Sequence, residues 1–107
     1  MRFWELYEGV FTRIPVGKYH VSILDHVKDR LKERKLKSWH ISRILNKLPN
    51  LEKEIDQTEI REGFFVIDRK LNVSIGMSRR DDKNLTMITI IDTSTPYARE
   101  VDKFFYI

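Results

Sequence analysis

The sequence predicts an α+β fold in which a pair of helices packs on one face of a three- to four-stranded antiparallel β-meander. Three observations lead to this prediction. Apolar residues recur every three or four positions only in the first half of the chain, whereas they alternate with polar residues in much of the second half. The connections between these segments are short. Helices and strands that are segregated along a chain are typical of α+β domains.

The composition limits the classes of protein to which this chain can belong. Its 107 residues, 41% hydrophobic and 34% charged, fit one domain over residues 1–107. It has no cysteine, which excludes a disulfide framework, a thiolate metal site and cysteine catalysis. No apolar run approaches the roughly 20 residues of a membrane helix, and no signal-peptide pattern is present at the N-terminus. We therefore expect a cytoplasmic protein with no membrane partner.

The first half of the chain predicts an arm and two helices. Residues 1–17 are rich in aromatic side chains and are interpreted as a short helix or irregular N-terminal arm over one edge of the core. Residues 22–35 are expected to form a helix with Ser22 as its N-cap and with apolar residues along one face. A second helix is expected over 38–48, so that residues 18–48 form a basic helical pair.

The second half, residues 51–107, predicts the antiparallel sheet. Residues 51–62 are acidic and are interpreted as a short strand followed by a loop. The segments beyond them are rich in β-branched and aromatic residues or alternate with period two, which is typical of strands. We expect these strands at 63–68, 71–77, 85–92 and 101–107.

The excess positive charge is concentrated in one stretch. The whole chain has a formal net charge of +4, yet residues 18–47 alone carry nine Lys or Arg and three Asp or Glu. Residues 48–107 carry nine basic and eleven acidic residues. Such an asymmetry is typical of proteins that bind a polyanion, but a solvated helical surface has the same pattern. Both interpretations stay open on charge alone.

One group of residues on the first predicted helix has the chemistry for RNA cleavage. His26, Arg30 and Arg34 follow one another at intervals of four and share a helix face. Histidine exchanges a proton near neutral pH, and arginine binds phosphate. The alternative is an exposed face on which Asp29 and Glu33 pair with neighbouring cations. We expect no metal and no cofactor, because histidine spacings and glycine-rich motifs typical of such sites are missing from the sequence.

The string His26-x-x-Asp29-Arg30-x-x-x-Arg34, followed by a second helix and then strands, resembles a pattern in the RelE/YoeB-like superfamily of small ribonucleases and toxins, which includes the BrnT-like toxins. Locally it is most similar to the RegB endoribonucleases of phages. The resemblance implies that His26 is catalytic and that the two arginines hold the scissile phosphate. The second catalytic histidine of RegB proteins falls on Asn46 here, and asparagine exchanges no proton near pH 7.

The resemblance implies a metal-independent endoribonuclease that acts on mRNA, with or without the ribosome. RNA contacts are expected to extend over further polar and basic residues, namely His40, Arg43, Asn46, Lys47, Arg79 and Arg80. Trp39 is interpreted as a packing residue, with base stacking as the alternative. The alternative function is a non-catalytic, phage-like or toxin-like module whose basic helix binds nucleic acid or an acidic host protein. A third interpretation is an inactive relative that dimerises through the aromatic arm.

Overall fold

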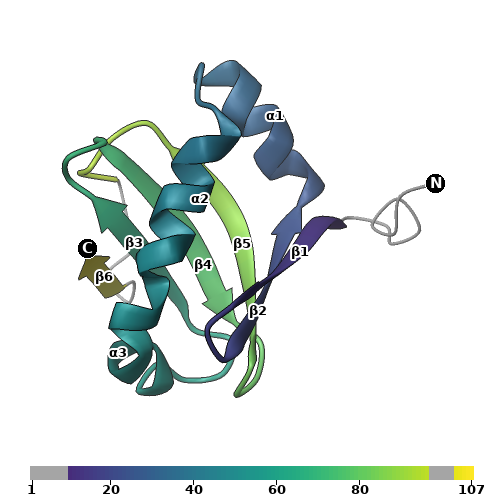
Figure 1. Ribbon diagram of the computed structural model, residues 1–107, viewed down its shortest axis with the longest axis vertical. Helices are drawn as coiled ribbons and strands as arrows, with labels where there is room; N and C mark the ends of the chain where they lie inside the picture. The colour runs from purple at the N-terminus through teal and green to yellow at the C-terminus, as the bar shows by residue number, and fades with distance from the viewer. Residues whose placement is uncertain (1–9, 97–102) are drawn as a thin grey trace.

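The computed structural model describes residues 10–96 and 103–107 (Figure 1). The α+β class is confirmed. Two longer helices lie among six strands, and the elements are β1 (Val10–Val16), β2 (Tyr19–Leu24), α1 (Asp25–Glu33), α2 (Ser38–Lys47), the 3-10 helix η2 (Leu48–Leu51), α3 (Glu52–Asp56), β3 (Gly63–Asp68), β4 (Val73–Arg79), β5 (Asn84–Ile91) and β6 (Lys103–Tyr106). None of the described helices has the length and apolarity that a membrane crossing requires.

The sheet is larger than predicted and is mixed. Its strand order is β1-β2-β5-β4-β3-β6, and α2 crosses one of its faces (Figure 1). The β2–β5 and β3–β6 pairs are parallel, whereas the other three pairs are antiparallel. The prediction of a purely antiparallel meander of three or four strands is therefore wrong. Both parallel pairs join segments far apart in the chain, and each adds a strand beside the meander formed by β3, β4 and β5.

The N-terminal strands were not predicted. Val10–Val16 forms β1, within the segment interpreted as an arm, and residues 1–9 of that arm lie outside the described residues. The helix expected over 22–35 begins only at Asp25, because the alternating residues Tyr19, Val21 and Ile23 are buried on one face of β2. Gly17, whose φ is +59°, makes the tight turn between β1 and β2.

The core lies between α2 and the sheet. The helix expected over 38–48 is confirmed as α2, which ends at Lys47 and buries Ile41, Ile44 and Leu45. The acidic segment interpreted as a strand instead forms η2 and α3, and this prediction is wrong. The reason is that Leu48, Leu51 and Ile55 recur at helical spacing and are all buried in the core. The strands predicted in the second half are present, with ends that differ by a few residues.

Helix α1 lies along β5 where β2 ends. β2 pairs with β5 only as far as Met87, so the rest of β5 has no strand on that side. The pairing of β5 with β4 skips Ile88, which is the extra residue of a β-bulge. α1 follows directly after β2 and packs against this part of β5, with Val27 fully buried. The open edge of β5 therefore faces the polar residues of α1.

Candidate functional site

The three residues predicted to be catalytic have partners within the fold. The Nε2 atom of His26 is hydrogen-bonded to the main-chain carbonyl of Ile88, the bulge residue of β5. The guanidinium of Arg34 donates to the carbonyl of Ile90 at 3.1 Å, and its Nε lies 3.7 Å from a carboxylate oxygen of Asp92. His26 and Arg34 thus satisfy carbonyls along the part of β5 that β2 does not reach.

Arg30 lies between them on α1 but has a different partner. Its guanidinium forms an ion pair with Glu33 at 3.1 Å, and both side chains are largely exposed. This is the pairing that the alternative interpretation of the helix face expects. The contacts therefore give each of the three residues a separate partner, and the assignment of a catalytic role stays a prediction.

Arg43 and Lys47, expected to bind RNA, both lie near one buried carboxylate. The Arg43 Nε and the Lys47 Nζ are each 3.9 Å from Asp68 Oδ2. Asp68 is fully buried at the end of β3, and its Oδ1 accepts hydrogen bonds from the main-chain N–H groups of Lys70 and Leu71. Because two cations share one carboxylate and are both partly exposed, this side of α2 keeps a net positive charge.

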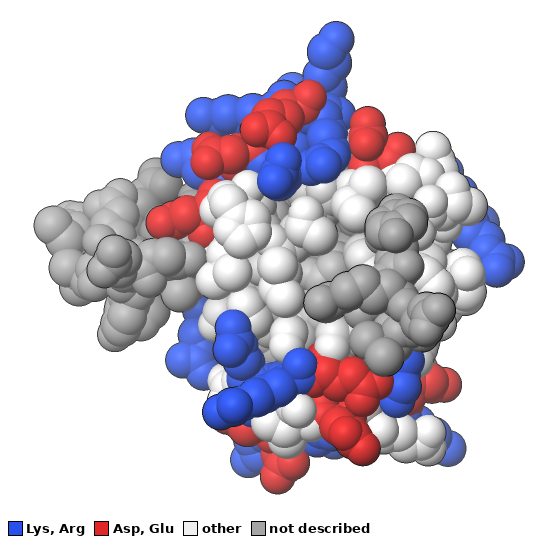
Figure 2. Space-filling model, turned by 180° about the vertical axis from the view of Figure 1, so that it is seen from behind, with Lys and Arg blue, Asp and Glu red and all other residues white. Residues whose placement is uncertain are grey.

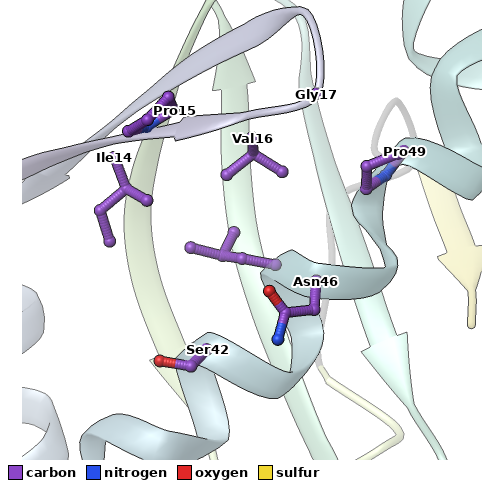
Figure 3. Close-up of a pocket in the computed structure, with 8 residues that line it drawn as sticks. Ile14, Pro15, Val16, Gly17, Ser42, Asn46 and Pro49 are labelled. Atoms are coloured by element: carbon purple, nitrogen blue, oxygen red, sulfur yellow. The ribbon is translucent and has the colours of Figure 1, made fainter.

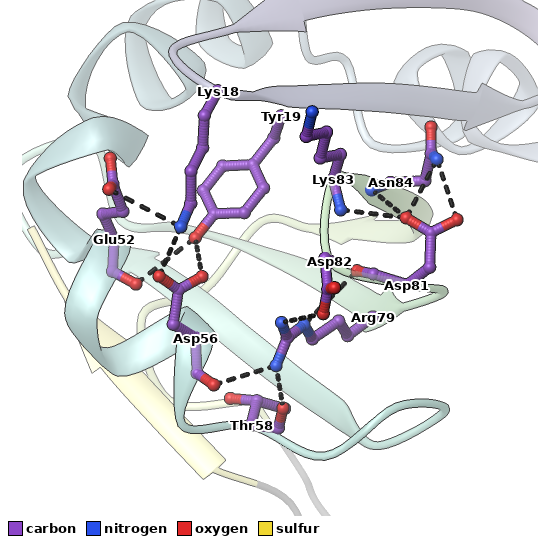
Figure 4. Close-up of polar contacts among 10 residues, drawn as sticks. All are labelled: Lys18, Tyr19, Glu52, Asp56, Thr58, Arg79, Asp81, Asp82, Lys83 and Asn84. Carbon is purple, nitrogen blue, oxygen red and sulfur yellow. Dashed lines mark hydrogen bonds and ion pairs between the residues drawn. The ribbon is translucent and has the colours of Figure 1, made fainter.

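Arg79 and Arg80 are neighbours in the chain, but only Arg79 is buried, with 8% of its surface exposed. The Arg79 guanidinium donates to the carbonyls of Asp56 at 2.9 Å and Thr58 at 2.6 Å, and so joins β4 to the end of α3 (Figure 4). Arg80 is exposed and donates through Nε to Thr86 Oγ1 at 2.9 Å. The interior contacts of Arg79 give it a role in stability and leave it little surface for a ligand.

A polar cluster that the sequence did not indicate joins the β1–β2 turn to α3. The Tyr19 hydroxyl donates to Asp56 Oδ1 at 2.7 Å, and Lys18 pairs with Asp56 and, at 3.6 Å, with Glu52 (Figure 4). The hydrogen bond from Lys18 lowers the pKa of Asp56 below its ordinary value. Burial, followed by the bond to Asp56, raises the pKa of Tyr19. Together with Arg79, these contacts hold α3 against both the first hairpin and β4.

The corner where α1 leads into α2 is different, because its lysines and Trp39 are exposed, while His40 caps α2 by accepting a hydrogen bond from the Lys37 N–H at 3.0 Å. Trp39 has 52% of its surface exposed, and its ring stacks on that of His40 with centroids 3.8 Å apart. Trp39 is therefore not part of the core, and the packing contact that it makes is the stack on His40. The structure records no ion pair between the exposed lysines of this corner and any described carboxylate. We call this set the basic corner, and its members are Lys32, Lys35, Lys37, Trp39 and His40.

Asn46, the last residue expected to contact RNA, lines a hollow beside α2. The hollow has a volume of about 220 Å³ and lies between α2 and the β1–β2 hairpin (Figure 3). Ser42 and Asn46 contribute from the helix, and Ile14 and Val16 from β1. The hollow shares α2 with Trp39, His40 and Arg43, so one helix links it to the basic corner.

The face of the sheet seen from behind is not part of the basic corner. Seen from behind, Lys and Arg gather at the two ends of the molecule together with acidic residues, and the described residues between these ends are largely uncharged (Figure 2). The exposed apolar residues Ile88, Phe104 and Tyr106 belong to β5 and β6. Over residues 10–96 and 103–107, no three His, Asp or Glu side chains form a group that could hold a metal ion.

Comparison with protein-family models, with curated proteins and with solved structures gives no match for this chain.

Proposed function

We propose that this protein is a non-catalytic module that binds single-stranded nucleic acid through the basic corner between α1 and α2. The observation that carries the proposal is the half-exposed Trp39, stacked on His40 near lysines that form no ion pair with any described carboxylate. Burying an indole normally stabilises a fold, so a tryptophan kept at the surface has an apolar face available to a ligand. Aromatic rings beside cations are what single-stranded nucleic acids require, since bases stack and phosphates are neutralised.

The distribution of charge supports the same surface. Helices α1 and α2 with their connection contain eight Lys or Arg and three Asp or Glu, and one of these acids, Glu33, is paired with Arg30. Arg43, one helical turn beyond Trp39, is partly exposed and extends the positive charge along α2. A phosphate backbone that crosses the basic corner would therefore meet cations on both sides of the stacking ring.

The contacts of α1 favour binding without catalysis. A histidine that acts as general base needs a ring nitrogen directed at the substrate, and the Ile88 carbonyl engages Nε2 of His26, which leaves only Nδ1 for that role. Arg34, which the endoribonuclease hypothesis assigns to the phosphate, is engaged by Ile90 and Asp92. Asn46 stands where RegB proteins have their second catalytic histidine, and an asparagine side chain exchanges no proton near neutral pH. The RelE- or RegB-type endoribonuclease remains a prediction, which the following experiment also tests.

The proposal is tested by fluorescence anisotropy with a fluorescein-labelled 12-nucleotide oligouridylate in EDTA. Because stacking contributes about 1–3 kcal/mol per base, Trp39→Ala is expected to weaken binding by roughly 5- to 150-fold. Ile60→Ala is the matched control, since Ile60 is similarly exposed, at 46%, but follows α3. Equal affinities of the Trp39→Ala variant and the wild type would contradict the proposal.

The same samples distinguish binding from cleavage. After incubation, the RNA is run on a denaturing gel beside a sample treated with the His26→Ala variant. We expect intact RNA in both. Cleavage by the wild type that is lost in His26→Ala would favour the endoribonuclease instead. An oligodeoxythymidylate of equal length measures the preference between RNA and DNA.

A further inference from the structure

The hollow beside Asn46 has the form of a small binding pocket. Its walls come from two elements distant in the chain, the β1–β2 hairpin on one side and α2 with η2 on the other (Figure 3). Residues that line it are mostly apolar or compact, namely Ile14, Pro15, Val16, Gly17, Ser42, Leu45, Asn46 and Pro49. Its volume of about 220 Å³ is below the range of roughly 300–1,000 Å³ typical of pockets for drug-sized ligands. A single flat ring system suits this size better than a whole nucleotide.

The polar chemistry of the pocket is concentrated in one amide. The Asn46 side chain is exposed and is hydrogen-bonded to no other described residue, so its carbonyl oxygen and its NH₂ group are both available. The other polar side chain, Ser42, already donates to the carbonyl of Ser38 at 3.4 Å. One acceptor and one donor side by side match the paired donor and acceptor on the edge of a nucleobase.

The narrow end of the pocket is fixed by the backbone. Gly17 has a φ of +59°, and a Cβ placed there would lie 3.3 Å from Pro49 Cγ. A larger residue at this turn would be strained by the positive φ and would need Pro49 to move by a few tenths of an ångström. With Pro15 and Pro49 on opposite sides, the pocket has two rigid apolar walls, which suit a planar ring.

The pocket also lies along the path that the proposed nucleic acid would follow. Trp39 and Asn46 are seven residues apart on α2, which is nearly two full turns, so both side chains project from a similar direction. Seven residues of helix rise about 10.5 Å, and stacked nucleotides are spaced by about 3.4 Å along a strand. A strand stacked on Trp39 would thus reach the pocket within about three nucleotides.

We propose that this pocket binds one base of the single-stranded nucleic acid and that Asn46 reads the hydrogen-bonding edge of that base. The inference deepens the proposed function and rests on it. In this arrangement the basic corner supplies affinity for any strand, and the Asn46 pocket supplies preference among bases.

The first test compares labelled 12-nucleotide homopolymers of uridine, cytidine and adenosine with an abasic strand of the same length. The wild type should bind the three homopolymers with unequal affinities, and Asn46→Ala should weaken the preferred one by about tenfold. The abasic strand should bind the variant and the wild type equally. Asn50→Ala is the matched control, since Asn50 is an exposed asparagine outside the pocket. An unchanged order of affinities in Asn46→Ala, or an equal loss on the abasic strand, would overturn the inference.

A second measurement separates this inference from the proposed function. Uridine, cytidine and adenosine are titrated separately into ¹⁵N-labelled protein, and amide shifts are followed by NMR. We expect shifts at Gly17, Ser42 and the Asn46 side chain with at least one nucleoside. If the homopolymers bind but no nucleoside moves these signals, the pocket inference fails and the proposed function stands. If no strand binds at all, the proposed function fails, and the nucleoside shifts alone decide whether the pocket binds bases.

Discussion

His26 and His40 belong to two helices that meet at one corner, yet the two histidines have different surroundings. His26 is hydrogen-bonded to the Ile88 carbonyl on the open edge of β5, and Arg34 does the same at Ile90. His40 caps α2, because its Nδ1 atom accepts a hydrogen bond from the Lys37 N–H at 3.0 Å, and its ring stacks on that of the half-exposed Trp39. Both histidines therefore have a partner in the fold, and the difference is that His26 lies at a strand edge whereas His40 lies against a half-exposed indole. Residue type alone does not distinguish these surroundings.

The largest expected effect concerns stability and comes from Arg79. Replacing Arg79 with Ala leaves the carbonyls of Asp56 and Thr58 without their buried donor. We expect the free energy of unfolding to fall by about 2–4 kcal/mol, measured by urea denaturation. Arg80→Ala, at the exposed neighbour, should cost under about 1 kcal/mol. Equal losses for the two variants would contradict the structural role assigned to Arg79.

The next effect concerns the charge of the basic corner. Each lysine that neutralises a phosphate on a single strand contributes about 0.7 to the slope of log K against log salt. Replacing all three lysines of the corner with Gln should therefore reduce the slope by about 2 and the affinity at 0.1 M salt by about a hundredfold. A control variant carries the same change at three exposed basic residues near the other end of the molecule, Lys53, Arg61 and Lys83. If the control loses as much affinity as the corner variant, binding does not depend on the corner.

Variants of α1 test whether its polar residues stabilise the fold or bind RNA. His26→Ala and Arg34→Ala each remove a hydrogen bond to a β5 carbonyl and should lower the free energy of unfolding by about 1–2 kcal/mol. Arg30→Ala removes only an exposed ion pair and should change it by about 0.5 kcal/mol or less. None of the three should alter the salt slope of RNA binding by as much as the corner variant. A complete loss of RNA binding in folded His26→Ala would show that RNA binding depends on His26, against the role assigned to it here.

The smallest effect is the pH dependence that the Lys18–Tyr19–Asp56 cluster confers. The pKa of Asp56 is lowered in the folded state, so its contribution to stability is present above the unfolded value of about 3.9 and is lost as the pH falls through the folded pKa. The pKa of Tyr19 is raised, so its contribution is lost as the pH rises above about 10. Asp56→Asn should therefore flatten the decline of Tm below pH 4, with Glu54→Gln as the control. An unchanged acid limb in Asp56→Asn would show that the cluster contributes nothing.

Much of the fold follows from local sequence patterns, and the rest depends on distant pairing. α2 is predictable because Ile41, Ile44 and Leu45 lie at helical spacing, and β5 because it is rich in β-branched residues. β2 was missed although Tyr19, Val21 and Ile23 alternate, since the helical stripe that follows overlaps their pattern. The two parallel pairings, β2 with β5 and β3 with β6, depend on contacts between segments far apart in the chain, and no local pattern specifies them.

The candidate site was predictable in composition but not in orientation. The charge asymmetry indicated the stretch of chain that contains the basic corner, because eight basic residues lie on or between α1 and α2. It did not indicate which polar residues of this stretch have partners within the fold. The contact of His26 with β5, for example, depends on β2 ending before β5 does. The exposure of Trp39 likewise depends on how the turn after α1 directs the first residues of α2. The pocket at Asn46 requires the β1–β2 hairpin, which was not predicted.

The most direct test of the account is to map where a single strand binds. An unlabelled 12-nucleotide oligouridylate is titrated into ¹⁵N-labelled protein, and the amide shifts are assigned by residue. The account predicts that the largest shifts lie in residues 35–43, with smaller ones toward Asn46, and that the amides of His26, Ile88 and Ile90 stay in place. Shifts centred on His26 and β5, with none in residues 35–43, would contradict it.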